Sequence, residues 1–151
     1  MDICIRLAVP DDIPAMAGLL GLLFAQEGEF GADPERQNRG LSMILAAPDA
    51  GGLFVAEAAS EVVGMVSVLF TVSTALGGRA ALLEDMVVAP GWRAAGVGAR
   101  LLDAALDHCR AAGVKRVTLL TDEDNSVAGR FYEKLGFTAS GMRPYRKRLP
   151  D

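Results

Sequence analysis

The amino-acid sequence predicts an α/β domain of the α+β type, with a mixed, largely antiparallel central sheet flanked by helices on both faces. Three observations carry this prediction. The N-terminal part has helical segments with clear start signals, the pattern changes to strand-like apolar runs from Leu53, and a long amphipathic helix follows a further strand. The length of 151 residues favours a single domain over residues 1–151.

Composition and charge exclude several function classes. Half of the residues are hydrophobic and the mean hydropathy is positive, which excludes a disordered chain. A net charge of −4 argues against broad phosphate neutralisation by a nucleic-acid binder. There is no basic amphipathic helix for a membrane surface, and the longest uncharged apolar run, residues 13–25, is too short to cross a bilayer.

Cysteine usage and the N-terminus favour the cytoplasm. Cys4 and Cys109 show neither a CxxC spacing nor a spaced histidine, so we expect reduced thiols and no metal site. The first residues carry charges and lack the anatomy of a signal peptide. The sequence leaves open whether the protein forms a homodimer.

The first half of the chain reads as one strand and two helices followed by a hairpin. Alternating apolar residues predict a strand over 3–7, and acids in the first turn precede a buried helix over 13–25. Asp33 as N-cap and Pro34 at the first helical position predict a second helix ending near Ala47. A turn at 59–61 then joins two apolar strands.

The central stretch runs from a strand over 82–89 through a glycine-bearing turn into a helix over 98–112. The first amides of a helix have no partner inside it and carry a partial positive charge, so this turn suits a pyrophosphate. One alternative is a simple tight connection. Another is a dinucleotide fingerprint with Asp122 on the ribose, although Leu101 is large for its third glycine position. A Walker A loop is excluded, since no Lys-Ser or Lys-Thr follows.

Two motifs in this half of the chain point to one family. The string V-x-P-x-x-R-x-x-G-x-G resembles the coenzyme A loop of the GNAT superfamily, the acyl-CoA-dependent N-acetyltransferases. Its positions are Val88, Pro90, Arg93, Gly96 and Gly98. After the next strand, over 114–121, comes the family's second motif, an asparagine, a short helix with Phe-Tyr and a closing Gly-Phe. Its positions are Asn125, Phe131, Tyr132, Gly136 and Phe137. The resemblance covers roughly residues 4–148.

The resemblance implies transfer of the acetyl group of acetyl-CoA to a primary amine by direct attack, with no metal. The pyrophosphate would rest on the amides of 94–99 beside Arg93, and backbone groups near Val88 would hold the pantetheine arm. The implied coenzyme-binding residues are Met86, Val87, Val88, Arg93, Ala94, Ala95, Gly96, Val97, Gly98, Ala99, Asn125 and Tyr132.

The implied chemistry needs a base and an acid. A primary amine has a pKa near ~10.4, so a base must take its proton. The resemblance implies Glu84 as base, Asp85 as anchor for a cationic amine, and Tyr132 as the acid that protonates the coenzyme sulfur. Glu84 and Asp85 are neighbours on a strand, so they point to opposite faces unless a bulge breaks the alternation. A family variant with its glutamate at the position of Leu120 is not available here.

The acceptor side and the basic C-terminus are less defined. The resemblance places Glu27, Glu29 and Phe30 toward a small acceptor, with solvated loop residues as an equal alternative. The weak apolar alternation of the C-terminal segment predicts one or two closing strands. Its cations would meet coenzyme phosphates or an acidic partner, or serve as solvated charges that resist edge-to-edge pairing. Two other function classes stay open: an acyl-CoA-binding regulatory module without turnover, and a dinucleotide-binding enzyme.

Overall fold

The computed structural model describes residues 2–27 and 31–150, and of residues 26 and 27 only the backbone. The chain divides into two compact units, Met1–Leu120 and Thr121–Asp151. Among the described residues, the larger unit contains the sheet and three α-helices, and the smaller unit contains a fourth. One domain over residues 1–151 stays a prediction.

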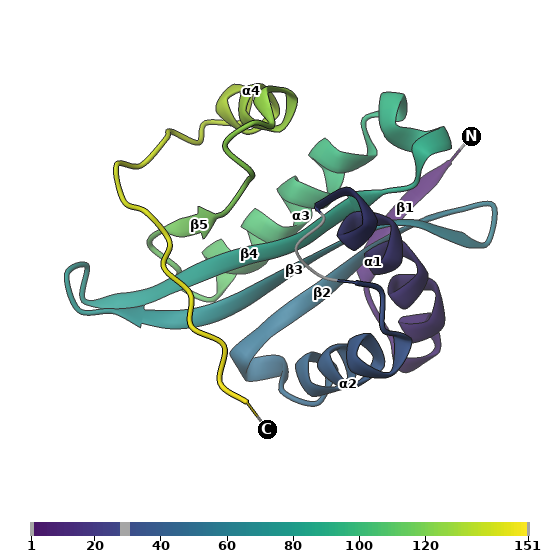
Figure 1. Cartoon of the computed structure of the whole chain (residues 1–151), viewed down its shortest axis with the longest axis horizontal. Helices are drawn as coiled ribbons and strands as arrows, with labels where there is room; N and C mark the ends of the chain where they lie inside the picture. The colour runs from purple at the N-terminus through teal and green to yellow at the C-terminus, as the bar shows by residue number, and fades with distance from the viewer. Residues whose placement is uncertain (1, 28–30, 151) are drawn as a thin grey trace. The chain divides into compact units, whose positions relative to one another are not determined.

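A five-stranded sheet forms the centre of the larger unit, with the strands in sequence order (Figure 1). Its strands are β1 (Ile3–Leu7), β2 (Gly51–Ala58), β3 (Glu61–Ser73), β4 (Gly78–Val88) and β5 (Val117–Leu119). The first three pairings are antiparallel, and β4 pairs with β5 in parallel. The predicted fold class, a mixed and largely antiparallel sheet, is confirmed.

This topology contradicts the dinucleotide-binding alternative. A dinucleotide fold places its glycine turn after the first strand of a mostly parallel sheet. Here the glycine turn follows the fourth strand, which lies antiparallel to its neighbour β3. The side chain at the third fingerprint position, Leu101, is fully buried, as a packing residue would be.

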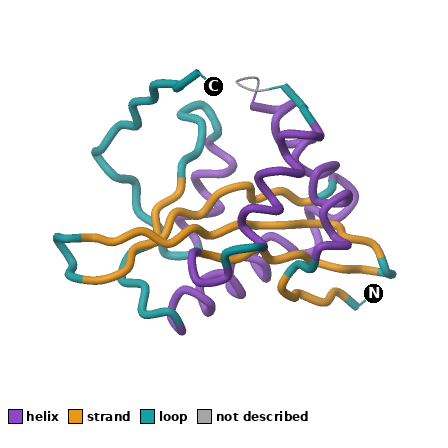
Figure 2. Tube along the Cα trace, turned by 90° about the horizontal axis from the view of Figure 1, so that it is seen from below, coloured by secondary structure: helices purple, strands orange, loops and turns teal. Residues whose placement is uncertain are grey.

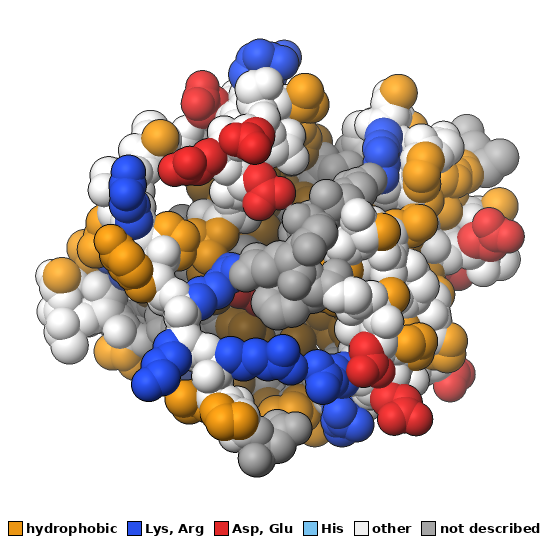
Figure 3. Space-filling model, in the orientation of Figure 1, with side chains coloured by type: hydrophobic (Ala, Val, Ile, Leu, Met, Phe, Trp, Pro, Cys, Tyr) orange, Lys and Arg blue, Asp and Glu red, His pale blue; other side chains and the backbone are white. Residues whose placement is uncertain are grey.

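Helices cover both faces of the sheet in the larger unit (Figure 2). Helices α1 (Ile13–Glu27) and α2 (Pro34–Leu45) lie on one face, and α3 (Val97–Ala111) lies on the other. Helix α2 starts as predicted, since the Asp33 side chain accepts a hydrogen bond from the amide of Arg36 at 3.3 Å and Pro34 is the first helical residue. Figure 3 shows both basic and acidic side chains over α2.

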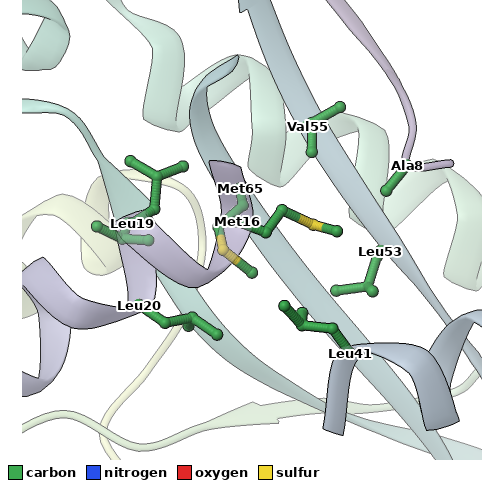
Figure 4. Packing of buried hydrophobic residues seen from close by; sticks show 9 residues of the cluster. Ala8, Met16, Leu19, Leu20, Leu41, Leu53, Val55 and Met65 are labelled. Carbon is green, nitrogen blue, oxygen red and sulfur yellow. The ribbon is translucent and has the colours of Figure 1, made fainter. Parts of the chain in front are cut away.

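The core between the sheet and the first two helices consists of buried hydrophobic side chains (Figure 4). Full burial of a valine, leucine or methionine side chain contributes about 1.5–3 kcal/mol to the free energy of folding, relative to an exposed side chain. Helices α1 and α2 contribute Met16, Leu19, Leu20 and Leu41, and the sheet and the end of β1 contribute Ala8, Leu53, Val55, Met65 and Val87. This core fixes β3 and β4 against α1, the arrangement on which the candidate site depends.

An ion-pair network joins the end of β1 to the start of α1. The Asp12 carboxylate accepts hydrogen bonds from Arg6 at 2.7 and 3.0 Å and from the amide of Val9 at 2.8 Å. Arg6 also donates to Glu57 of β2 at 3.0 Å. The hydrogen bonds from Arg6 hold the pKa of the Asp12 carboxyl below its usual range, although burial opposes this.

On the other face, a glycine lets the start of α3 approach the sheet closely. A Cβ atom at Gly64 would lie 2.9 Å from Leu101 Cδ1, 3.2 Å from Val97 Cγ1 and 3.3 Å from the Val87 carbonyl oxygen. Both helix side chains are fully buried. The absence of a side chain on Gly64 therefore sets the distance between β3 and the first turn of α3.

The last turn of α3 packs on aromatic rings. His108 lies between Phe54, edge-on at 5.3 Å, and Phe70, stacked at 5.8 Å. Its Nε2 is buried and has no hydrogen-bond partner among the residues that the structure describes. A Cβ atom at Gly52 would lie 3.1 Å from this nitrogen, so a second glycine sets the approach of the other end of α3.

The smaller unit contains helix α4 (Ser126–Lys134). Asn125 caps its start, and its C-terminus closes in a Schellman motif: Phe137 N–H donates to the Tyr132 carbonyl and Gly136 N–H donates to that of Glu133, both at 3.1 Å. Gly136 has φ +94°, the left-handed conformation that the motif requires.

In the described part of the smaller unit, residues 138–150 form no strand, so the prediction of closing strands was wrong. Their apolar alternation is weak, Pro144 lacks an amide donor, and the side chains are exposed. Strand β5 is also shorter than the predicted 114–121. Among the described residues, no helix combines the length and apolar character needed to cross a membrane.

Candidate active site

A β-bulge interrupts β4 at the two neighbouring acids. Met65 of β3 lies opposite Val87 of β4, whereas Ser67 lies opposite Glu84. One residue between them on β3 therefore faces two on β4, residues 85–86, which defines a bulge. Bulges redirect side chains and often occur next to active sites. The bulge thus identifies the end of β4 as a candidate site.

The bulge decides which face of the sheet Glu84 occupies. Met65 and Ser67 are two residues apart on β3 and share a face, so their partners Val87 and Glu84 also share one. Val87 belongs to the core under α1 and α2, and Glu84 is exposed, so Glu84 lies on the α1–α2 side. Regular alternation therefore fails between Glu84 and Val87, and Asp85 within this segment adopts φ +55°.

The bulge carries strain and a specific hydrogen bond. A non-glycine residue at positive φ, such as Asp85, costs about 1–3 kcal/mol, which the surrounding structure must offset. The hydroxyl of Ser67, which is only 1% exposed, donates to the Glu84 carbonyl oxygen at 3.1 Å. The sequence interpretation missed Ser67. The available signal was a polar residue in the middle of an apolar strand.

Beyond the bulge, β4 has an edge that β5 does not cover. Strand β5 pairs only with 81–83 of β4. The amide of Ala89 donates to Val63 of β3, so the backbone groups of Val88, one residue earlier, face the opposite edge. Val87 is paired with Met65 of β3, and Met86 belongs to the bulge. This edge offers backbone donors to an extended ligand.

The turn after β4 presents a helix start without a side-chain cap. A 3₁₀ turn over Pro90–Ala95 ends at Gly96, whose φ of +75° is left-handed, and α3 begins at Val97. No side chain caps α3 and its first turn has no acid. The first amides of α3 therefore lack intrahelical partners and add the positive end of the helix dipole.

Two arginines surround this helix start. Arg93 and Arg100 are both exposed, and Arg93 Nε donates to the Val88 carbonyl at 3.1 Å. That hydrogen bond connects the Arg93 side chain to the end of β4. Residues 94–99 are alanine, glycine or valine, so none of their own side chains is bulky or polar. The turn is therefore suited to an anion such as a diphosphate.

In the smaller unit, α4 positions the two remaining predicted residues. The Asn125 Oδ1 accepts from the amide of Ala128 at 3.0 Å as the helix cap. Tyr132 packs edge-on against Phe131 and Phe137, at 5.2 and 5.8 Å between ring centroids. Burial raises the pKa of the Tyr132 phenol. Tyr132 therefore keeps its proton at neutral pH and can serve as a proton donor.

The predicted site residues fall into three groups. Glu84 to Val88 and the turn at 93–99 are consecutive on β4, the turn and α3, so the fold brings them together. Asn125 and Tyr132 belong to the smaller unit, and their approach to Glu84 stays a prediction. Phe30 and Glu29 lie outside the described residues, and so does the side chain of Glu27, the last residue of α1. Within the described part of the chain, no three His, Cys, Asp or Glu side chains form a metal-binding group.

Comparisons with known proteins cover both predicted motifs. The model of the acetyltransferase (GNAT) family matches residues 19–137. The N-acetyltransferase YhfO of Bacillus subtilis, described as uncharacterized, is 35% identical over 85 residues, 56% of this chain and 57% of that protein. A glucosamine 6-phosphate N-acetyltransferase of Trypanosoma brucei brucei is 35% identical over 88 residues, 58% of each chain. The match thus spans less than two thirds of either relative.

A solved structure extends the likeness over nearly the whole chain. The crystal structure of a transcriptional regulator from Bacillus halodurans matches with a TM-score of 0.86 and 27% sequence identity. The match covers 98% of this chain and 100% of the other.

Proposed function

Because the chain belongs to the acetyltransferase (GNAT) family, we propose that it transfers the acetyl group of acetyl-CoA to a primary amine of a small acceptor. The observation that carries this proposal is the uncapped start of α3 directly after the bulged, partly unpaired end of β4. An anion site and an open strand edge in succession suit a ligand with a diphosphate followed by an extended amide-bearing arm.

The coenzyme would bind along these two features. Its diphosphate accepts hydrogen bonds from the amides of residues 94–99, and Arg93 and Arg100 supply positive charge nearby. The pantetheine arm then follows the free edge of β4, where the Val88 amide faces away from β3 and Met86 lies in the bulge. The Val88 carbonyl accepts a hydrogen bond from Arg93, and the Val88 amide is the donor that would polarise the thioester carbonyl. Asn125 would bond the pantetheine through its amide NH₂, because its Oδ1 caps α4.

Glu84 would act as general base. A protonated amine cannot attack, so Glu84 takes one proton from it, directly or through a water, and the nitrogen then attacks the thioester carbon. Such a base typically contributes about 10²–10⁴ in rate. The exposure of Glu84 on the α1–α2 face supports this role, as α1 and α2 are the elements expected to border the acceptor. Asp85 would anchor a second positive charge of the acceptor.

Tyr132 would complete the reaction as general acid. When the tetrahedral intermediate collapses, its C–S bond breaks and the leaving thiolate takes the phenolic proton, which yields free coenzyme A and an N-acetylated product. The raised pKa of Tyr132 supports this role, because the phenol is protonated before the sulfur leaves. The proposal that the acceptor is a small amine is supported by the relative named for glucosamine 6-phosphate. A cytoplasmic location is part of the same proposal.

A second candidate function is an acyl-CoA-binding regulatory module without turnover. It is favoured by the fold shared with the protein described as a transcriptional regulator. Both candidates require the same coenzyme site, so coenzyme binding alone does not separate them. Turnover does.

Two measurements test the proposal. At about a hundred times its Kd, acetyl-CoA should stabilise the protein by ~2.7 kcal/mol and raise Tm by roughly 5–10 °C, whereas NADH should leave Tm unchanged. Release of free thiol is then followed across a panel of polyamines, amino sugars and amino acids. Thiol release that requires an amine supports the enzyme. Stabilisation without release for every amine would favour the regulatory module, and a failure of acetyl-CoA to stabilise would contradict both.

A further inference from the structure

We propose that Ser67 is a positioning residue, whose hydroxyl holds the β4 bulge and thereby keeps Glu84 on the acceptor face. The inference rests on the proposed function in that Glu84 is the base. Ser67 is a buried residue of β3 and takes no part in the proposed reaction itself.

The environment of Ser67 leaves its hydroxyl little choice of partner. The side chain is 1% exposed in the middle of β3, between the buried residues Val66 and Val68. A buried hydroxyl without a partner loses its hydrogen bonds to water without replacement. Its partner is the Glu84 carbonyl oxygen, at 3.1 Å. Satisfying Ser67 therefore requires the Glu84 backbone to stay in this position.

The hydrogen bond lies where the ladder between β3 and β4 is irregular. Pairing is regular from Ser67 and Glu84 toward the hairpin, and again beyond Met65 and Val87. A bulge disrupts the ladder locally, so a side-chain donor at its edge replaces part of what the backbone loses. Ser67 is thus placed at the boundary between the two registers.

Loss of the bulge would change the face on which Glu84 lies. A one-residue slip in register moves every side chain of a strand segment to the opposite face. Because Val87 is locked into the core under α1, the slip would fall on the segment that contains Glu84. The carboxylate would then turn toward the α3 side, away from an acceptor bound near α1 and α2. A bulge that loosened without a change of register would leave Glu84 on the same face, but its carboxylate would occupy a wider range of positions.

Ser73 provides a matched control on the same strand. It is also buried, at 6% exposure, and its Oγ accepts a hydrogen bond from the amide of Leu76 at 3.2 Å, at the hairpin end of β3. Ser67→Ala and Ser73→Ala both delete one buried hydroxyl with one backbone partner. We expect both variants to lower Tm by a similar few degrees. Only Ser67→Ala should speed amide hydrogen exchange over residues 84–88.

A kinetic cycle tests whether Ser67 acts through Glu84. Thiol release is measured for wild type, Ser67→Ala, Glu84→Gln and the double variant, with kcat and the amine KM separated. We expect Ser67→Ala to lower kcat about tenfold in the wild-type background and less than twofold in the Glu84→Gln background, while Ser73→Ala leaves kcat within twofold. An equal loss in both backgrounds would overturn the inference.

The two readouts keep this inference distinct from the proposed function. If wild type shows no amine-dependent thiol release, the proposed function fails, and exchange over 84–88 still decides whether Ser67 holds the bulge. If wild type is active but exchange and kcat respond equally to Ser67→Ala and Ser73→Ala, the role of Ser67 is overturned and the proposed function stands.

Discussion

Replacing Gly64 by alanine tests whether the approach of α3 to the sheet sets coenzyme affinity. The new Cβ would lie 2.9 Å from Leu101 Cδ1, 3.2 Å from Val97 Cγ1 and 3.3 Å from the Val87 carbonyl. The two helix side chains are fully buried and the third neighbour is backbone. We therefore expect the first turn of α3 to move outward by a few tenths of an ångström. This turn carries the amides proposed to bind the diphosphate.

The magnitude follows from overpacking. Extra atoms in a well-packed core typically cost 1–3 kcal/mol, which for a chain of this size lowers Tm by about 3–10 °C. Displaced amides would also lengthen several hydrogen bonds to the diphosphate. We expect acetyl-CoA affinity, measured by titration calorimetry, to fall about tenfold, which corresponds to about 1.4 kcal/mol.

Gly52→Ala is the control at the other end of α3. Its Cβ would lie 3.1 Å from His108 Nε2, so the variant disturbs the last turn of the helix instead of the first. It should lower Tm but leave acetyl-CoA affinity within twofold. Equal affinities for Gly64→Ala and wild type, or an equal loss in Gly52→Ala, would refute the link between this packing and the coenzyme.

Three further variants test other parts of the structure. Gly96→Ala forces φ +75° on a residue with a side chain, so it should cost about 1 kcal/mol in urea unfolding and weaken acetyl-CoA binding. Tyr132→Phe should keep acetyl-CoA affinity but lose at least tenfold in kcat. In wild type, the fall of kcat on the alkaline side should lie above the ordinary tyrosine pKa. An unchanged kcat in Tyr132→Phe would remove Tyr132 from the mechanism. Asp12→Asn should destabilise by about 1–3 kcal/mol at pH 7. Because the folded pKa of Asp12 is lowered, its contribution is present above the unfolded pKa near ~3.9 and is lost as pH falls through the folded value, so wild type and Asp12→Asn should converge in acid.

Local patterns were sufficient to predict most elements of the larger unit. Asp33 and Pro34 define the start of α2 through a cap and a fixed φ, both of which depend on adjacent residues only. The glycine turn before α3 was likewise predictable, because Gly96 adopts a conformation that other residues avoid. The prediction of C-terminal strands was wrong, because the weak alternation of apolar and polar residues did not determine whether residues 138–150 would pair with another strand.

The details of the candidate site depend on pairing between strands. The two acids at 84–85 were expected on opposite faces unless a bulge intervened, and the bulge is a property of the register between β3 and β4. Ser67 lies 17 residues from Glu84 in sequence, so no local pattern connects them. Their relation depends on the core that fixes Val87 opposite Met65.

The most direct test of the central claim is a crystal structure of the protein with acetyl-CoA bound. The claim predicts the diphosphate on the amides of residues 94–99, the thioester carbonyl at the Val88 amide, and the acetyl carbon between Glu84 and Tyr132. A diphosphate bound elsewhere, or a Tyr132 hydroxyl far from the coenzyme sulfur, would contradict it.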